Sequence, residues 1–400
     1  MMHLIPSHQG RPSDDPIFAL NREATERAKR GESIVNATVG ALLDDQGKLA
    51  ILPTAAKAVH DVPAEEWAAY APIAGSPDFL GAVMDDLLGS DARYRSCATA
   101  AATPGGSGAL RHALANFLEH GQAMLTTSYY WSPYQTLADE CERRVETFEM
   151  FDASGGFNVD ALDAAVAKQI AAQGRALLFL NDPCHNPTGY SMSEAEWKAV
   201  VERLGRHADR APVTVLLDIA YAAYGETDLA RVLDACAPLL GRAAILFAWS
   251  ASKQFTHYGL RVGALVAAIP DAKERAAVES ALSYSCRGTW SNCNRGGLRA
   301  ITNLLKNPEL AAACRAERDG MKDMLRKRVA VFNREAHARG LKYPRYEGGF
   351  FVTVFHADAK AKAAAMREQG VYVVPITDAL RVGLCSVAER DISRLVEALV

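Results

Sequence analysis

Apolar runs of strand length alternate with helical patterns along the middle of the chain. Three runs are nearly continuous in apolar residues, at positions 176–180, 213–217 and 244–248. Apolar residues at helical spacing occupy the segments at 159–172, 193–205 and 228–236. Ser193 and Glu196 form a capping box, and Gly205 is the expected end of that helix. This alternation predicts crossovers onto a parallel sheet whose strands are covered on both faces.

The two ends of the chain show a different pattern. Asp15 and Pro16 suit the cap and first position of a helix that Gly31 closes. One long helix is predicted from Pro308 to about Gly340, followed by short strand-like and helix-like segments at 350–355, 359–369, 371–374, 380–385 and 388–400. We therefore predict a large domain over residues 46–314. A smaller α+β domain would combine residues 1–45 with residues 315–400.

The composition narrows the class of protein. The 400 residues include 44 Lys and Arg against 47 Asp and Glu, a formal net charge of −3, and 49% are hydrophobic. A near-balanced charge excludes a dominant nucleic-acid surface, and the composition excludes collagen-like and disordered chains. No apolar run approaches the roughly 20 residues of a membrane helix, and the N-terminus lacks the apolar core of a signal peptide. We expect a folded cytoplasmic protein.

The eight cysteines contain no C-x-x-C pair. This spacing argues against a zinc site or a thioredoxin-type redox pair, and no metal site is expected. In a chain of this length the cysteines do not resemble a disulfide framework either. They are predicted to be small buried thiols.

Polar groups follow each of the three predicted strands. Asn186 lies in an Asn-Pro-Thr-Gly turn after the first, Asp218 directly follows the second, and Lys253 lies in a Ser-Ala-Ser-Lys segment after the third. Each of these residues could instead have no functional role. A lysine after a strand is usually solvated at the surface, and an aspartate or an Asn-Pro turn often only shapes a loop. Because ligands bind beyond the carboxyl ends of parallel strands, the three groups are expected to converge.

A glycine-rich turn adds a candidate anion site. Residues Gly105–Gly108 precede a helix predicted from Ala109 to about Phe117, and Arg261 follows Lys253 by eight positions. Free N–H groups at a helix N-terminus and a guanidinium both bind phosphate. An amine, an acid, an amide and an anion cradle together fit pyridoxal phosphate, which needs a lysine and an acidic partner for its ring nitrogen.

The sequence resembles the class I aminotransferases of the fold type I pyridoxal-phosphate enzymes, and within them the aspartate/aromatic aminotransferase subgroup. The resemblance covers nearly the whole chain and rests on three motifs: Asn186-Pro187-Thr188-Gly189, Asp218-x-x-Tyr221, and Ser250-x-Ser252-Lys253 with Arg261. It implies an α/β fold. In that fold a large domain has a mainly parallel sheet flanked by helices, and a smaller α+β domain accompanies it.

The resemblance also implies the cofactor site. Lys253 would hold the cofactor covalently and move the substrate's Cα proton, while Asp218 would keep the ring nitrogen protonated. Asn186 and Tyr221 would donate to the phenolic oxygen, and Trp131 would stack on the ring. The residues that match the phosphate site are Gly105, Gly106, Ser107, Ser250, Arg261 and Tyr70 of the partner subunit.

The implied substrate site involves both chains of a homodimer. Arg381 matches the arginine that binds the substrate α-carboxylate, and Gly40 matches a glycine whose backbone approaches it, with Asn186 and Trp131 nearby. Arg287 of the partner subunit would bind a side-chain carboxylate. The alternative for Arg287 is a surface ion pair.

The chain departs from the subgroup at three places. Many members have a Pro-Pro pair after the Arg287 motif and Ser-Gly-Thr in the phosphate turn, and often a histidine after the stacking tryptophan. This chain has instead Cys293-Asn294-Arg295-Gly296, Gly105-Gly106-Ser107 and Tyr134. These departures are expected to affect substrate preference rather than the cofactor.

The implied reaction is a ping-pong transamination. An aspartate or aromatic amino acid would give its amine to a 2-oxo acid such as 2-oxoglutarate. A β-lyase or a decarboxylase on the same scaffold is the alternative, because the same lysine and aspartate serve both. A regulator that binds DNA would need an added basic domain, and no segment of this chain has that composition.

Overall fold

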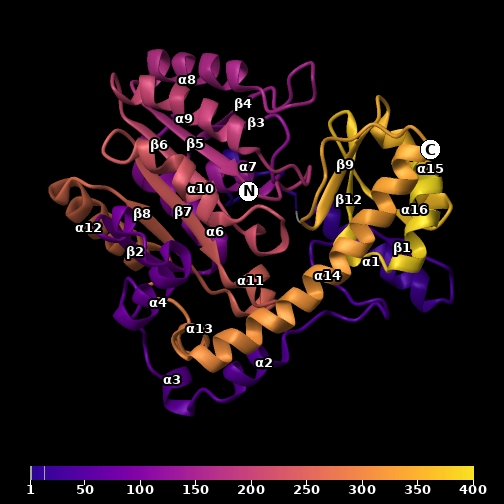
Figure 1. Ribbon diagram of the computed structural model, residues 1–400, viewed down its shortest axis with the longest axis horizontal. Helices are drawn as coiled ribbons and strands as arrows, with labels where there is room; N and C mark the ends of the chain where they lie inside the picture. The colour runs from indigo at the N-terminus through magenta and orange to yellow at the C-terminus, as the bar shows by residue number, and fades with distance from the viewer. Residues whose placement is uncertain (1, 13) are drawn as a thin grey trace.

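A seven-stranded sheet forms the centre of the larger part of the molecule (Figure 1). The computed structural model describes residues 2–12 and 14–400. The strand order is β2-β8-β7-β6-β5-β3-β4. The strands are β2 (Ala98–Thr103), β3 (Ala123–Thr127), β4 (Arg144–Phe148), β5 (Ala176–Asn181), β6 (Val213–Asp218), β7 (Ala244–Ser250) and β8 (Gly263–Ala268). The three predicted strands are β5, β6 and β7.

The sheet is mainly parallel, as predicted, with one exception. β4, β3, β5, β6 and β7 are parallel neighbours, whereas β8 is antiparallel to both β7 and β2. The chain reverses direction over residues 251–262 without crossing a face of the sheet, and such a connection yields an antiparallel pair. Because β2 pairs in turn with β8, its end lies at the same edge as the ends of β5, β6 and β7.

Helices cover both faces of this sheet, which explains the continuous apolar runs. Leu178 and Leu180 of β5 pack into one core cluster, and Leu177 and Phe179 into another on the opposite face. The first face carries α8 (Val159–Gln173), α9 (Glu194–Ala208) and α10 (Leu229–Cys236); the second carries α6 (Gly105–Phe117), α7 (Pro133–Glu140) and α12 (Ala272–Thr289). A strand buried on both faces loses the polar alternation of an exposed strand.

Two helix ends differ from the predictions. The capping box of Ser193 and Glu196 begins α9 as expected, but α9 continues through Gly205 to Ala208. A Cβ atom on Gly205 would lie 2.5 Å from Nη1 of Arg242, so this glycine makes room for a side chain and does not end the helix. α6 begins at Gly105, so the glycine-rich turn is itself the first helical turn.

The smaller part of the molecule contains the C-terminus and the N-terminal segment. An antiparallel sheet has the order β11-β12-β9, and a parallel pair joins β1 (Val35–Asn36) to β10 (Val371–Tyr372). The other strands are β9 (Phe351–Phe355), β11 (Val374–Ile376) and β12 (Ala379–Gly383). α1 (Pro16–Lys29), α15 (Ala359–Glu368) and α16 (Ile392–Leu399) accompany them. The segment predicted as one strand over 371–374 is thus divided between two sheets.

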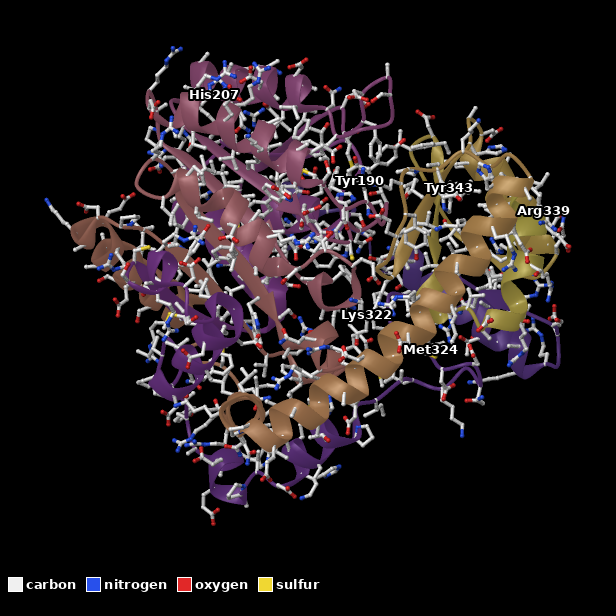
Figure 2. The ribbon with its side chains drawn as sticks, in the orientation of Figure 1. Tyr190, His207, Lys322, Met324, Arg339 and Tyr343 are labelled. Atoms are coloured by element: carbon white, nitrogen blue, oxygen red, sulfur yellow. The ribbon has the colours of Figure 1, made fainter. Side chains whose placement is uncertain are left out.

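One long helix connects the two parts. α14 (Pro308–Ala338) runs from beside α2 (Pro53–His60) and α13 (Arg295–Lys306) to the small sheet, and Lys322 and Met324 lie along its middle (Figure 2). Met321 packs against the core clusters of both parts. The predicted boundary at residues 314 and 315 falls within this continuous helix, and the division into domains stays a prediction. Three further short helices are α3 (Ala64–Ala68), α5 (Ala92–Arg95) and α11 (Ala251–Gln254).

The cysteines, the helices and the possible metal ligands were each the subject of a prediction. All eight cysteines are buried and free, as expected. Among the described residues, no helix combines the length and apolar character needed to cross a bilayer. Residues 2–12 and 14–400 also contain no group of three His, Cys, Asp or Glu side chains placed to hold a metal ion.

Candidate active site

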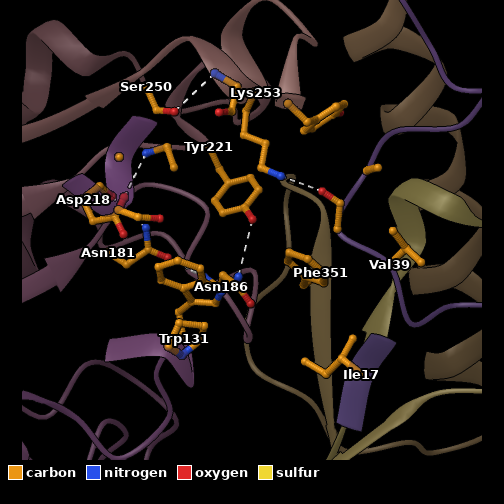
Figure 3. Close-up of a pocket in the computed structure, with 18 of the residues that line it drawn as sticks. Ile17, Val39, Trp131, Asn181, Asn186, Asp218, Tyr221, Ser250, Lys253 and Phe351 are labelled. Atoms are coloured by element: carbon orange, nitrogen blue, oxygen red, sulfur yellow. Dashed lines mark hydrogen bonds between the residues drawn. The ribbon is translucent and has the colours of Figure 1, made fainter. Parts of the chain in front are cut away.

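A cavity of about 420 Å³ lies where the carboxyl ends of the central strands face the small sheet and α1 (Figure 3). The wall formed by the large sheet includes Gly106, Ser107, Trp131, Asn186, Asp218, Tyr221, Ser250, Lys253 and Arg261. The opposite wall includes Asp15, Ile17, Phe18, Val39, Gly40, Phe351 and Arg381. The cavity therefore gathers most of the residues that the sequence predicted to act together.

Lys253 points into the cavity from the short helix α11, directly after β7. Its Nζ atom donates a hydrogen bond to the carbonyl of Gly40 at 2.7 Å and lies 4.4 Å from the centre of the Tyr258 ring. Burial lowers the pKa of Lys253 to about 8, because removal from water disfavours the ammonium form. A lysine with this pKa offers a substantial neutral fraction, which is the nucleophilic form.

Asp218 lies at the end of β6, beside the end of β5. Its Oδ2 atom accepts a hydrogen bond from the Tyr134 hydroxyl at 2.7 Å, and Oδ1 accepts one from the Ala220 amide at 3.2 Å. Burial raises the pKa of Asp218, while these two hydrogen bonds and the charge of Lys253 act in the opposite direction. The carboxylate is thus held by neutral donors on one side and faces the cavity on the other.

Asn186 and Tyr221 lie next to each other in the cavity, and the centre of the Tyr221 ring is 5.6 Å from Nζ of Lys253. The Asn186 side-chain amide approaches the Tyr221 hydroxyl at 3.4 Å, and the Oδ1 atom of Asn186 is buried without a partner among the described residues. Trp131 lies on the same side of the cavity as Asn186 (Figure 3). A buried polar atom without a partner indicates that a bound group completes the site.

The first turn of α6 and Arg261 form an anion cradle. Nη1 of Arg261 donates to the Ser252 hydroxyl at 3.2 Å, and Nη2 donates to the Pro104 carbonyl at 3.2 Å. Gly105 has a φ of 72°, and a Cβ atom there would lie 2.5 Å from Nη2 of Arg261. The close approach of this guanidinium therefore explains why glycine stands at the first position of the turn. Backbone N–H groups at the start of a helix add further donors for a phosphate.

Arg381 provides the opposite wall with a buried cation. It is 6% exposed, its Nη2 atom donates to the Thr38 carbonyl at 2.6 Å, and its guanidinium lies 4.7 Å over the Phe351 ring. Its Nε atom is buried without a partner, and no carboxylate pairs with it among the described residues. Burial lowers the pKa of Arg381, but a guanidinium keeps its charge. Asp15 of the same wall acts on this charge only without direct contact, so a buried cation with no ion pair suits an anionic ligand.

Three predicted residues do not line this cavity in the single chain: Gly105, which packs against the Arg261 guanidinium, and Tyr70 and Arg287. Tyr70 is 86% exposed, and its side chain projects from the surface. Arg287 lies at the end of α12, where it is exposed and donates to the Ser291 hydroxyl at 2.7 Å. Both were predicted to act in the site of a partner subunit, and these roles stay predictions.

A sequence model described as aminotransferase class I and II matches residues 32–399. The chain belongs to this family. It is 28% identical over 378 residues to the aspartate aminotransferase of Pseudomonas aeruginosa, a match that covers 90% of each chain. An aminotransferase structure from Anaerococcus prevotii superposes with a TM-score of 0.94 at 30% identity, covering 100% of this chain and 98% of that one.

A further structure identifies the cofactor chemistry. The aromatic-amino-acid aminotransferase of Burkholderia pseudomallei, covalently bound to pyridoxal phosphate, matches with a TM-score of 0.82 and 26% identity over 100% of this chain and 99% of that one. The present aminotransferase uses pyridoxal phosphate and catalyses transamination; the comparisons do not favour the β-lyase or decarboxylase alternative. The cavity fits this cofactor, because the Lys253 amine, the Asp218 carboxylate, the Asn186 side-chain amide and the anion cradle all line it.

The sequence reasoning missed two residues that line this cavity, Asn181 and Tyr258. Asn181 links the site, since its side chain donates to the Asp218 carbonyl at 2.7 Å and accepts from the Asn186 amide at 2.6 Å. Its position at the end of β5 was the available signal. Tyr258 lies against Lys253 and follows no motif. Tyr134 lies outside the cavity and donates a hydrogen bond to Asp218; its expected effect on substrate preference stays a prediction.

Proposed function

We propose that this aminotransferase moves an amino group between an aspartate or aromatic amino acid and a 2-oxo acid such as 2-oxoglutarate. The observation that carries this proposal is Arg381, a buried cation without a carboxylate partner that shares one cavity with Lys253. A planar guanidinium suits the α-carboxylate that all of these substrates have in common.

The residues of the cavity have separate roles in the proposed reaction. Bound pyridoxal phosphate supplies an electron sink for the charge that develops at the substrate Cα. Lys253 holds the cofactor covalently and, once released, moves the proton that leaves Cα. Asp218 keeps the ring nitrogen protonated, and Asn186 and Tyr221 donate to the phenolic oxygen. Trp131, which lines the cavity, would stack on the ring and exclude water from its face.

The residues that would hold the phosphate and the substrate carboxylate come from the two different walls of the cavity. The proposed phosphate ligands are Gly105, Gly106, Ser107, Ser250, Arg261 and the partner subunit's Tyr70. Arg381 binds the substrate α-carboxylate, and the backbone of Gly40 belongs to the same wall; the 2.7 Å bond from Lys253 to the Gly40 carbonyl supports this proximity. A side-chain carboxylate would pair with the partner subunit's Arg287.

A substrate panel tests the proposed reaction. The purified holoenzyme is incubated with 2-oxoglutarate and, in turn, aspartate, tyrosine, phenylalanine and a branched-chain amino acid. Formation of glutamate together with the matching 2-oxo acid is the expected result. Release of ammonia or CO₂ without glutamate would overturn the proposal.

A mixing experiment tests the proposed homodimer with shared sites. Lys253→Ala and Arg287→Ala chains, each defective with aspartate, are unfolded together and refolded. In a mixed dimer one site combines an intact Lys253 with an intact Arg287 of the partner subunit. Random pairing should restore about a quarter of wild-type aspartate turnover if the two chains share sites as a closed dimer. No recovery in a mixed dimer shown to form would contradict the sharing.

We also infer a cytoplasmic location for this aminotransferase. The support is that all eight cysteines are free, which is typical of a reducing compartment. Cell fractionation with an antibody to the chain checks this inference, and recovery in a secreted or membrane fraction would contradict it.

A further inference from the structure

Tyr134 is fixed against Asp218 by a set of aromatic rings. The residue is 1% exposed and lies in the first turn of α7. Its ring meets Trp131 edge-on at 5.8 Å and Phe179 edge-on at 5.4 Å, and it stacks on Tyr130 at 6.3 Å. These contacts hold the hydroxyl in one position, 2.7 Å from Oδ2 of Asp218.

The direction of this hydrogen bond is also fixed. Within the described part of the chain, Asp218 is the one hydrogen-bond partner of the Tyr134 hydroxyl. Burial and the neighbouring carboxylate raise the pKa of Tyr134 well above its usual value, so the phenol keeps its proton throughout the working range. A neutral phenol with one carboxylate neighbour donates to it, and such a charge-assisted bond is stronger than a neutral one.

We propose that Tyr134 is a positioning residue that orients the Asp218 carboxylate toward the cofactor ring nitrogen and stabilises its negative charge. Tyr134 is not part of the cavity wall, so it acts through Asp218 and not by touching the substrate. The inference rests on the proposed role of Asp218. It also accounts for the tyrosine that stands where many relatives of this subgroup have histidine.

The first test removes only the hydroxyl. Tyr134→Phe keeps the aromatic packing, and cofactor-stripped protein is titrated with pyridoxal phosphate. We expect the dissociation constant to rise about tenfold or more, the usual weight of a hydrogen bond to a charged group. Tyr130→Phe is the matched control, because this neighbouring tyrosine stacks on the same ring and has no hydrogen bond among the described contacts. An unchanged dissociation constant in Tyr134→Phe would overturn the proposal.

The second test separates this proposal from the role of Asp218. Asp218→Asn alone should weaken cofactor binding more than Tyr134→Phe does. The double variant should bind the cofactor no more weakly than Asp218→Asn. If Tyr134 acts through Asp218, its loss has no further effect once Asp218 has been replaced. Additive losses would show that Tyr134 does not act through Asp218. If Asp218→Asn itself has no effect, the assignment of Asp218 fails instead.

A spectroscopic measurement distinguishes positioning from mere packing. The visible absorbance of the bound cofactor is titrated with pH in wild type, Tyr134→Phe and Tyr130→Phe. A shifted midpoint in Tyr134→Phe alone supports an electrostatic effect carried by Asp218. If Tyr134→Phe lowers the thermal midpoint of unfolding but leaves the absorbance midpoint unchanged, Tyr134 is only a packing residue.

Discussion

The two walls of the cavity are built in different ways. On the cofactor wall, Asn186, Asp218 and Lys253 follow three adjacent strands of one sheet, and the register pairs Asn181 with Asp218 and Asp218 with Ala248. On the substrate wall, Arg381 is held by the carbonyl of Thr38, which is 343 positions away in the sequence. The cofactor wall is built from neighbouring strands of one sheet. The substrate wall brings together residues from the two ends of the chain.

By our proposal, the cofactor wall carries out the chemistry and the substrate wall recognises the substrate. The strands behind the cofactor wall are buried on both faces, so its groups keep their relative positions. The substrate wall depends on the N-terminal segment and, by our proposal, on the partner subunit's Arg287. Changes in the first wall should therefore affect cofactor binding and the turnover of every substrate, whereas changes in the second should affect substrate recognition and leave cofactor binding unchanged.

The largest effect is expected from Lys253→Ala. Loss of the amine removes both the covalent attachment and the proton transfer, and the latter alone is worth up to about 10⁴-fold in rate. Turnover should fall by at least this factor with every amino acid. Borohydride reduction followed by mass spectrometry should find the cofactor fixed to the wild type and absent from the variant. Equal fixation in both would show that Lys253 is misassigned.

A smaller effect, confined to substrate recognition, is expected from Arg381→Lys. Lysine keeps the charge but loses the planar fork, and kcat/KM should fall by about 100-fold for all α-amino acids. The dissociation constant for pyridoxal phosphate should stay unchanged, since the two walls are separate. Arg345→Lys is a matched control, because Arg345 lies 4.7 Å over the Tyr190 ring much as Arg381 lies over Phe351, but outside this cavity. Weakened cofactor binding in Arg381→Lys would show that the substrate wall also affects the cofactor and would contradict this prediction.

The contrast between the two walls also explains which features of the fold could be predicted from the sequence. The apolar runs of β5, β6 and β7 were recognisable because both faces of these strands are buried, and the polar residues after each strand marked the cofactor wall. Pairings between distant segments leave no such pattern. Residues 371–374 appeared to be one strand, but Val371 pairs with Val35 and Val374 with Arg381.

The remaining misses have a similar physical origin. Nothing local in the sequence connects Tyr134 with Asp218, which are 84 positions apart. Gly205 suggested a helix end because glycine has a low helix propensity, but its missing side chain makes room for Arg242. Gly105, at the start of α6, likewise makes room for a side chain from elsewhere in the chain, the guanidinium of Arg261. Arg381 and Arg287 were identified only through the resemblance to a family.

Arg287→Ala should discriminate between substrates. Loss of a charge-assisted pair should lower kcat/KM for aspartate and 2-oxoglutarate by about 10- to 100-fold, while phenylalanine, which has no second carboxylate, should react as before. Steady-state rates for the separate half-reactions measure both effects. An equal loss with aspartate and phenylalanine would place Arg287 outside the recognition of the side chain, and unchanged aspartate turnover would leave it as a surface residue.

The smallest expected effect is the dependence of the rate of cofactor attachment on pH, which tests the cofactor wall. The pKa of Lys253 is lowered to about 8, so the neutral amine dominates above that pH. Cofactor attachment to the stripped protein should therefore accelerate from pH 6 to 8 and level off by about pH 9, whereas an ordinary lysine would gain about tenfold per pH unit up to pH 10. Stopped-flow absorbance measures this rate. A rate that rises without levelling off would mean that burial does not lower the pKa of Lys253.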